Sequence, residues 1–245
     1  MSKIYALTDI HGYLDILMET MKKVDLSNND KLIFLGDYID DGPNGRQTLE
    51  YIYALQKQYP NQIIVLKGNH EEWFIDWLEN DIEIAYFQAD KNLETLRTFL
   101  NDNQLGSIAN YLKNGKSIFE INGIIKKYIK SNYSELISWV KDLPLFYETD
   151  KQIFVHAGID EEAGEYWKLA TDDYYFTEKY PATTGKFLKD IIAGHVRVST
   201  IANDRNFHDI FFDGESHYYI DSTVEISQKL NVLIYDEETN EYAFK

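Results

Sequence analysis

Short apolar runs alternate with amphipathic segments over the first 66 residues. Runs at 3–8, 31–35 and 62–66 are rich in Ile, Leu and Val and predict buried strands. Between them, apolar residues recur at helical spacing over 14–21 and 49–55. Strands that alternate with helices predict βαβ units and a parallel or mixed sheet, so the fold class is α/β (α+β).

The pattern changes between residue 71 and about residue 143. Apolar residues there keep a helical spacing, from Trp73 and Trp77 to Leu136 and Val140, and the alternation typical of strands is missing. We therefore predict a helical insertion at about 72–143 within a single domain that covers residues 1–245.

Strand patterns return after Pro144. Apolar runs occupy 145–149, 152–158 and 190–196. Two later segments predict hairpins, the first because Asp213-Gly214 is a strong turn signal and the second because a polar turn lies near residues 238–240. The second half of the sheet structure is therefore expected to be largely antiparallel.

Polar groups follow the apolar run at five separate strand ends. They are Asp9 and His11, Asp37 and Asp40, Asn69 and His70, His156, and His195. Ligands of open α/β sheets bind beyond the carboxyl ends of the strands. We expect these side chains to meet at one edge of the fold, although one histidine at one strand end would usually be structural.

The chemistry of this set favours divalent cations. Carboxylates, an amide and imidazoles without sulfur suit Mn²⁺, Fe or Zn²⁺, and there are enough donors for two ions bridged by a shared carboxylate. The chain has no cysteine, which excludes disulfides and thiolate metal sites.

The charge of the chain excludes several classes of partner. The net charge is −17 and the pI is about 4.7, so binding to nucleic-acid backbones or to anionic membranes is not expected. The sequence has no signal peptide pattern and no apolar stretch of about 18 residues, which favours a cytoplasmic enzyme without a membrane span.

Five motifs together carry a family resemblance: DIH at 9–11, GDYIDDG at 36–42, GNHE at 68–71, HAG at 156–158 and GHV at 194–196. With these motifs the chain resembles the calcineurin-like metallophosphoesterases of the phosphoprotein phosphatase superfamily, in its bacterial and phage serine/threonine phosphatase branch. The resemblance implies a four-layer β-sandwich flanked by helices, with mixed sheets.

The resemblance also implies a role for each motif residue. Asp9 and His11 would hold a first metal, Asp37 would bridge both metals, and Asn69, His156 and His195 would hold the second. His70 is similar to the general acid of the family, and Asp40 would orient it. By this analogy, metal-bound hydroxide attacks phosphorus in line.

One position departs from the family pattern. Where the family has a phosphate-binding arginine after GDxxD, this chain has Asp41. Arg46 and, ranked slightly below it, Arg197 are the candidate replacements, and a solvated surface role is an even alternative for each. The family's second arginine has no counterpart between His156 and His195, where Lys168 or Lys179 could serve.

Four further polar residues have structural interpretations. Asp221 is expected to cap a turn after a late strand, and His208 and His217 are expected at the surface. Glu71 is expected to cap the helix that follows GNHE, where an acid meets the positive end of the helix dipole.

Three functions compete. The first is a phosphatase with two metals, most simply Mn²⁺, acting on phosphoserine or phosphothreonine in proteins or on small phosphomonoesters. The second keeps the fold but cleaves a dinucleoside polyphosphate, with the helical insertion as a selective lid. The third is a non-catalytic binding protein, which is disfavoured because no ligand position and no acid histidine is missing.

Overall fold

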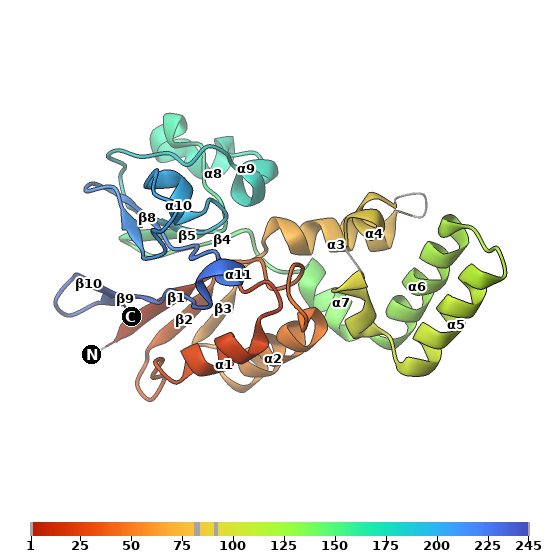
Figure 1. Cartoon of the computed structure of the whole chain (residues 1–245). Helices are drawn as coiled ribbons and strands as arrows, with labels where there is room; N and C mark the ends of the chain where they lie inside the picture. The colour runs from red at the N-terminus through yellow and green to blue at the C-terminus, as the bar shows by residue number, and fades with distance from the viewer. Residues whose placement is uncertain (1, 81–83, 91–92, 245) are drawn as a thin grey trace.

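The computed structural model describes residues 2–80, 84–90 and 93–244. Two five-stranded sheets are stacked on each other (Figure 1). The first sheet has the order β10-β9-β1-β2-β3. Its strands are β1 (Lys3–Leu7), β2 (Lys31–Phe34), β3 (Ile63–Val65), β9 (Leu233–Asp236) and β10 (Glu241–Phe244). β1, β2 and β3 are parallel to one another, with β3 at one edge, and β9 and β10 form an antiparallel pair at the other edge.

The second sheet has the order β4-β5-β6-β8-β7. Its strands are β4 (Phe146–Glu148), β5 (Gln152–Val155), β6 (Asp190–Ala193), β7 (Phe211–Phe212) and β8 (His217–Tyr219). The expectation of a largely antiparallel second half is wrong for this sheet, because β5, β6 and β8 are parallel. Long crossovers join these strands, and the predicted hairpins form only at the edges, as β7–β8 and β9–β10.

Alternation along the strands builds the layers. Ile4 and Ala6 of β1 face the apolar core between the sheets, where they meet Phe154 and Ile192 of the second sheet. The intervening side chains of β1 point to the opposite face, because successive residues of a strand alternate. There they pack against α1 (Leu14–Met21) and α2 (Gly45–Gln58).

Short helices cover the outer face of the second sheet. They are η3 (Glu161–Tyr166), α8 (Trp167–Ala170), α9 (Asp173–Glu178) and α10 (Val198–Ile201), and α11 (Val224–Ser227) lies before β9. Trp167, Phe176 and Val198 pack there against Ile153 and Val155 of β5. The result is a helix–sheet–sheet–helix arrangement, as the family resemblance implies (Figure 1).

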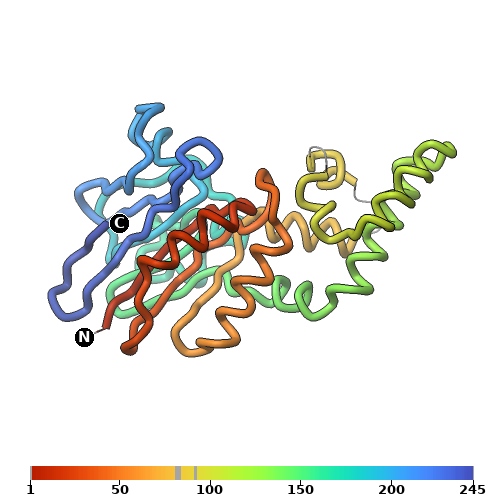
Figure 2. Tube along the Cα trace, turned by 60° about the horizontal axis from the view of Figure 1, so that its bottom comes forward, coloured from red at the N-terminus to blue at the C-terminus, as the bar shows by residue number. Residues whose placement is uncertain are grey.

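Helices fill the described part of the region predicted as an insertion. They are α3 (Asn69–Glu79), α4 (Ala85–Ala89), η2 (Leu96–Phe99), α5 (Asp102–Lys113), α6 (Ile118–Asn132) and α7 (Ser134–Lys141). They form an arm that points away from the sheets, with α5 and α6 at its far end (Figures 1 and 2). The core of the arm is continuous with the core under the first sheet, since Phe74 and Val140 belong to the same apolar cluster as Leu49 of α2.

α3 begins at Asn69, earlier than the predicted start of the insertion at residue 72. Asn69 and His70 therefore stand in the first turn of this helix. None of the helices in the described residues is long and apolar enough to cross a membrane.

Candidate metal and phosphate site

The polar groups predicted to meet do lie around one hollow. The hollow has a volume of about 220 Å³, and its lining comprises Asp9, His11, Asp37, Asp41, Asn69, His70, Trp73, His195, Arg197, Asp221 and Glu225. It lies at the carboxyl ends of β1, β2, β3 and β6. His156, which follows β5, is fully buried directly behind it, with Nε2 2.9 Å from Asn69 Oδ1.

The loops that carry these groups have unusual backbone geometry. Asp9, His11, Asp37, Asp40 and His195 all have positive φ, between 47° and 69°. Asp and His are among the few non-glycine residues enriched in this left-handed region. Left-handed non-glycine residues cost roughly 1–3 kcal/mol each and cluster at functional sites. Here they turn the backbone sharply in each loop, so that the side chains point into the hollow.

Motif glycines allow the loops to approach closely. A Cβ atom on Gly68 would lie 2.2 Å from Asp37 Oδ1 and 2.4 Å from Asp37 N. A Cβ atom on Gly194 would lie 2.1 Å from Asp9 Oδ2. Neither position can carry a side chain without displacing a carboxylate, which explains the glycine that precedes Asn69 and His195.

Glu71 joins two of the motifs. Its carboxylate is fully buried and accepts hydrogen bonds from the backbone N–H groups of Asp37 (2.9 Å), Tyr38 (2.8 Å) and Gly68 (3.1 Å). The bond from Gly68 N is the helix cap predicted for this residue, and the other two fasten the Asp37 loop to α3. Burial, together with the charge of Asp37, raises the pKa of Glu71 to about 7.

Two histidines are oriented by backbone carbonyls. His156 Nδ1 lies 3.1 Å from Leu35 O, and His11 Nδ1 lies 3.2 Å from Ile39 O. A neutral imidazole that donates its Nδ1–H in this way leaves Nε2 as an acceptor, the usual preparation of a metal-binding histidine.

The Nε2 atom of His156 then faces other acceptors. It lies 2.9 Å from Asn69 Oδ1 and 3.3 Å from Asp37 Oδ2, and His195 Nδ1 lies 3.1 Å from the same Asn69 oxygen. A ring nitrogen that faces two oxygens at these distances must either carry a proton or share a cation with them. Burial lowers the pKa of His156, but the negative charge of Asp37 outweighs burial and raises this pKa to about 9.

The donors fit two neighbouring cations that share Asp37. The atoms of Asp37, His156 and His195 lie within 4.8 Å of one another, and so do those of Asp37, His11 and His70. Asp9 and Asp37 are each 2% exposed, and buried carboxylates are unfavourable unless cations or hydrogen bonds compensate them. Burial and the nearby Asp221 raise the pKa of Asp9. Oxygen and imidazole donors of this kind suit Mn²⁺, Fe or Zn²⁺.

His70 and Asp40 form a pair at the edge of the hollow. His70 Nδ1 lies 2.8 Å from Asp40 Oδ2, and Nε2 lies 3.9 Å from Asp37 Oδ2. The other oxygen of Asp40 accepts a 2.6 Å hydrogen bond from the Tyr86 hydroxyl, and Asp40 N donates to Thr95 Oγ1. Both of these partners come from the helical arm.

Arg46 does not line the hollow. Its Nη1 lies 2.6 Å from both carboxylate oxygens of Glu50, its Nε donates to Thr98 O, and its guanidinium lies over the ring of Tyr133. It fastens α2 to the arm. Arg197 does line the hollow, where Nη2 donates to Glu225 Oε1 at 2.8 Å.

The two lysines considered as replacements are bound elsewhere. Lys168 pairs with Glu148, and Lys179 pairs with Glu161. Neither appears among the residues that line the hollow in the described part of the chain.

Four residues were missed or misjudged from the sequence, two of them beside the site. Asp221 caps a turn as predicted, since Oδ1 accepts from Thr223 N, but it is also 5% exposed and lines the hollow. No local pattern in the sequence indicates the role of Tyr86, because its partner Asp40 is 46 residues away. The surface interpretation of His217 is wrong: it is 2% exposed, with Nδ1 3.1 Å from Asp213 Oδ2. His208 is half-buried, with Nδ1 3.0 Å from Ser222 O.

A family model described as calcineurin-like phosphoesterase matches residues 2–232. The chain belongs to this family. It is a hydrolase, as the resemblance implies, and the family uses divalent metals. The non-catalytic alternative is disfavoured accordingly.

Relatives of this phosphoesterase include phosphatases. A 63-residue stretch is 43% identical to the catalytic subunit of serine/threonine-protein phosphatase 6 of Caenorhabditis elegans. The match spans 26% of this chain and only 19% of that subunit, so the activity of the whole relative does not follow for this chain.

Solved structures share the fold at low identity. A cold-active protein tyrosine phosphatase has a TM-score of 0.61 at 16% identity, covering 99% of this chain and 78% of that chain. A Saccharomyces cerevisiae protein serine/threonine phosphatase has a TM-score of 0.56 at 14% identity, covering 100% and 79%. A candidate diadenosine tetraphosphatase has a TM-score of 0.57 at 14% identity, covering 99% and 92%. These likenesses confirm the predicted fold class.

We expect Mn²⁺ to stabilise this phosphoesterase through Asp37. At a Mn²⁺ concentration about 100 times Kd, binding contributes about 2.7 kcal/mol, or roughly 5–10 °C in Tm for a chain of this size. Asp37→Asn should remove most of that shift, measured by thermal unfolding of chelator-treated protein with and without Mn²⁺. The exposed control Asp150→Asn should keep it. An equal shift in Asp37→Asn would contradict the shared-ligand assignment.

The close approach at Gly68 predicts a second result. Gly68→Ala should abolish the Mn²⁺-dependent shift and lower stability, because the added methyl group overlaps Asp37. Gly106→Ala is the matched control: Gly106 lies within α5, and no atom lies within 4 Å of the place that an added Cβ would occupy. It should raise stability by roughly 0.5–1 kcal/mol, measured by urea unfolding. A Gly68→Ala protein that binds Mn²⁺ normally would contradict this account.

Proposed function

We propose that this phosphoesterase is a dinuclear-metal phosphatase that hydrolyses phosphomonoesters, with phosphoserine or phosphothreonine in a protein as the substrate. The observation that carries the proposal is the His70–Asp40 pair, 2.8 Å apart, on the rim of a hollow lined by metal-type donors. A metal site alone would support many hydrolytic reactions, whereas a histidine paired with a carboxylate beside it suits proton transfer to a leaving oxygen.

The ligand assignment follows the donor groups. Asp9, His11 and Asp37 would hold one cation, and Asp37 with Asn69, His156 and His195 would hold the other. We propose Mn²⁺, with Fe or Zn²⁺ compatible with the same donors. When bound, the two cations would polarise the phosphoryl group and lower the pKa of the attacking water.

His70 is proposed as the general acid. Asp40 occupies Nδ1, which leaves Nε2 as the proton donor on the side of Asp37. Burial lowers the pKa of His70, but the charges of Asp37 and Asp40 outweigh burial and raise it to about 10, so the imidazole is protonated at neutral pH. A cation on Asp37 would offset part of that effect, and Asp40 would then be the group that keeps the proton in place.

Arg197 is proposed to bind the substrate phosphate. It lines the hollow and is half-exposed, and its bond to Glu225 leaves other guanidinium N–H groups available. Arg46 is not proposed for this role, because its guanidinium is bonded to Glu50 and Thr98.

His70→Asn should lower kcat on phosphoserine peptides by about 10²–10⁴. The loss should be much smaller on p-nitrophenyl phosphate, whose leaving oxygen needs no proton. Metal content, measured by elemental analysis, should match the unmodified protein. An equal loss on both substrates would remove His70 from the acid role, and no turnover of any phosphoester by the Mn²⁺-loaded protein would refute the proposed function.

Asp41 is proposed to repel the substrate dianion. Asp41→Asn removes the charge, and asparagine tolerates the left-handed backbone at this position, where φ is 62°. We expect kcat/KM on p-nitrophenyl phosphate to rise about three- to tenfold, as for loss of one like charge a few ångströms away. Asp150→Asn should change nothing, and a fall in kcat/KM for Asp41→Asn would assign the carboxylate a supporting role instead.

A further inference from the structure

Trp73 borders three hollows that adjoin one another. It lines the hollow of about 220 Å³ with the metal-type donors, and a second of about 290 Å³ with His70 and Asp40. It also lines a third hollow of about 380 Å³ between α3 and α4. The first and second hollows also share His70, and the second and third share Tyr86 and Ala89, so the three form a series that runs from the metal-type donors to the helical arm.

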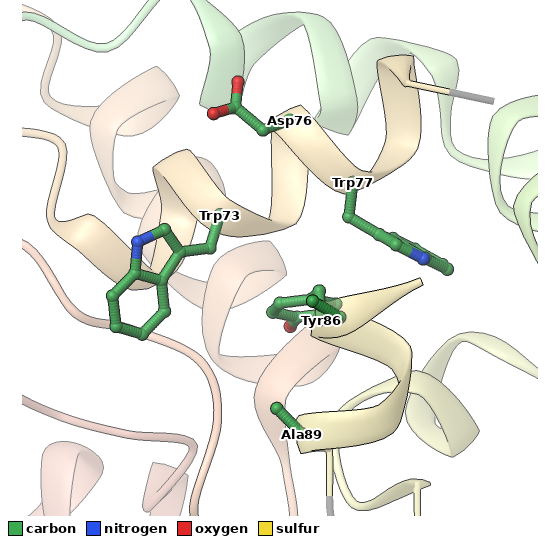
Figure 3. Close-up of a pocket in the computed structure, with 6 residues that line it drawn as sticks. Trp73, Asp76, Trp77, Tyr86 and Ala89 are labelled. Carbon is green, nitrogen blue, oxygen red and sulfur yellow. The ribbon is translucent and has the colours of Figure 1, made fainter. Parts of the chain in front are cut away.

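The third hollow has aromatic walls. Trp73, Trp77 and Tyr86 line it with Ala85 and Ala89, and the one charged residue of the described lining is Asp76, whose carboxylate points away from α4 (Figure 3). The Trp77 and Tyr86 rings pack 5.5 Å apart, and Trp73 Nε1 donates to Glu178 Oε1 at 2.6 Å. Trp73 is 42% exposed, whereas Trp77 is fully buried and Tyr86 is 9% exposed, so Trp73 provides most of the aromatic surface that a ligand can reach.

The middle hollow is acidic. Its lining includes Asp41, Asp90 and Glu94 besides the His70–Asp40 pair, and among the described lining residues there is no lysine or arginine. A leaving group that carries further phosphates would meet these carboxylates at close range and be repelled, whereas a cationic group would be attracted.

We propose that the middle and aromatic hollows together form the leaving-group groove for a phosphopeptide. A lysine or arginine close to the phosphorylated residue would lie against Asp41 and Glu94, because both carboxylate oxygens of Asp90 accept backbone hydrogen bonds from Thr95 and Leu96. An aromatic side chain farther along the peptide would lie against Trp73 and the exposed edge of Tyr86, since aromatic rings favour offset or edge contacts with one another. This inference rests on the proposed phosphatase function, and it names the peptide sequence that this site selects.

The position of the middle hollow beside His70 supports its assignment to the leaving group. The proposed proton donor, His70 Nε2, faces Asp37 in the metal-lined hollow, so the leaving oxygen would lie there beside the phosphate. The group attached to that oxygen would extend past His70 and Trp73, which line both this hollow and the middle one. A dinucleoside polyphosphate would place its remaining phosphates there, against the acids.

Four phosphoserine peptides test the groove, with phenylalanine or glycine at the aromatic position and lysine or glycine at the basic position. The aromatic position is scanned over the residues on either side of the phosphoserine. We expect kcat/KM for the peptide with both lysine and phenylalanine to exceed that of the double-glycine peptide by at least tenfold. Diadenosine tetraphosphate, measured in parallel, should be a poorer substrate than either.

Three variants separate the groove from general effects of charge. Ala89 borders both hollows, so Ala89→Lys should fill their junction and reduce the phenylalanine preference to about twofold or less. Gln88→Lys adds the same charge one residue away, at an exposed position outside the groove lining, and should keep the preference. Glu94→Gln should reduce the lysine preference and leave the phenylalanine preference intact, which provides a second readout if Ala89→Lys is poorly folded.

The possible outcomes are distinguishable. Hydrolysis of all four peptides at equal kcat/KM would overturn the groove while the phosphatase function stands. Equal effects of Ala89→Lys and Gln88→Lys would also overturn it. Turnover of diadenosine tetraphosphate with no turnover of any phosphopeptide would refute the proposed function, and the groove with it.

Discussion

The buried carboxylate of Asp37 is the group on which the rest of the site depends. Its backbone N–H is bound by Glu71, and its Oδ1 accepts from His70 N. Burial would raise the pKa of Asp37, but the imidazoles of His156, His70 and His11 outweigh burial and hold it well below its usual range. A carboxylate that stays ionised while buried demands positive charge around it, and this demand organises both strand-end loops and the first turn of α3.

The surrounding structure meets that demand at some expense in stability. Left-handed backbone at Asp9, Asp37 and His195 and glycines with no room for a Cβ atom are strained or entropically unfavourable features. The two packed sheets compensate for them, because Ile4, Ala6, Phe154 and Ile192 form an apolar layer that fixes both sets of carboxyl ends. A rigid sandwich can therefore carry a site that would not be stable by itself.

Local sequence signals predicted the strand-end residues well, since an apolar run followed by Asp, Asn or His marks both the strand and the side chain at its exit. Such local signals do not reveal contacts between residues that lie far apart in the chain. Tyr86 reaches Asp40 from another element, and parallel pairing of β5, β6 and β8 depends on long crossovers. The ion pair of Arg46 has a local sequence signal, because Glu50 lies four residues later on the same helix and side chains at this spacing can pair.

The helical arm connects substrate choice to the proposed proton transfer through one side chain. Tyr86 is a wall of the aromatic hollow, packing on Phe74 and Trp77, and its hydroxyl binds the carboxylate that orients His70. A ligand ring that contacts Tyr86 would restrict the same side chain that positions Asp40. In the proposed groove, binding energy from the distant part of a peptide would therefore act on the reacting oxygen through the residue that holds Asp40.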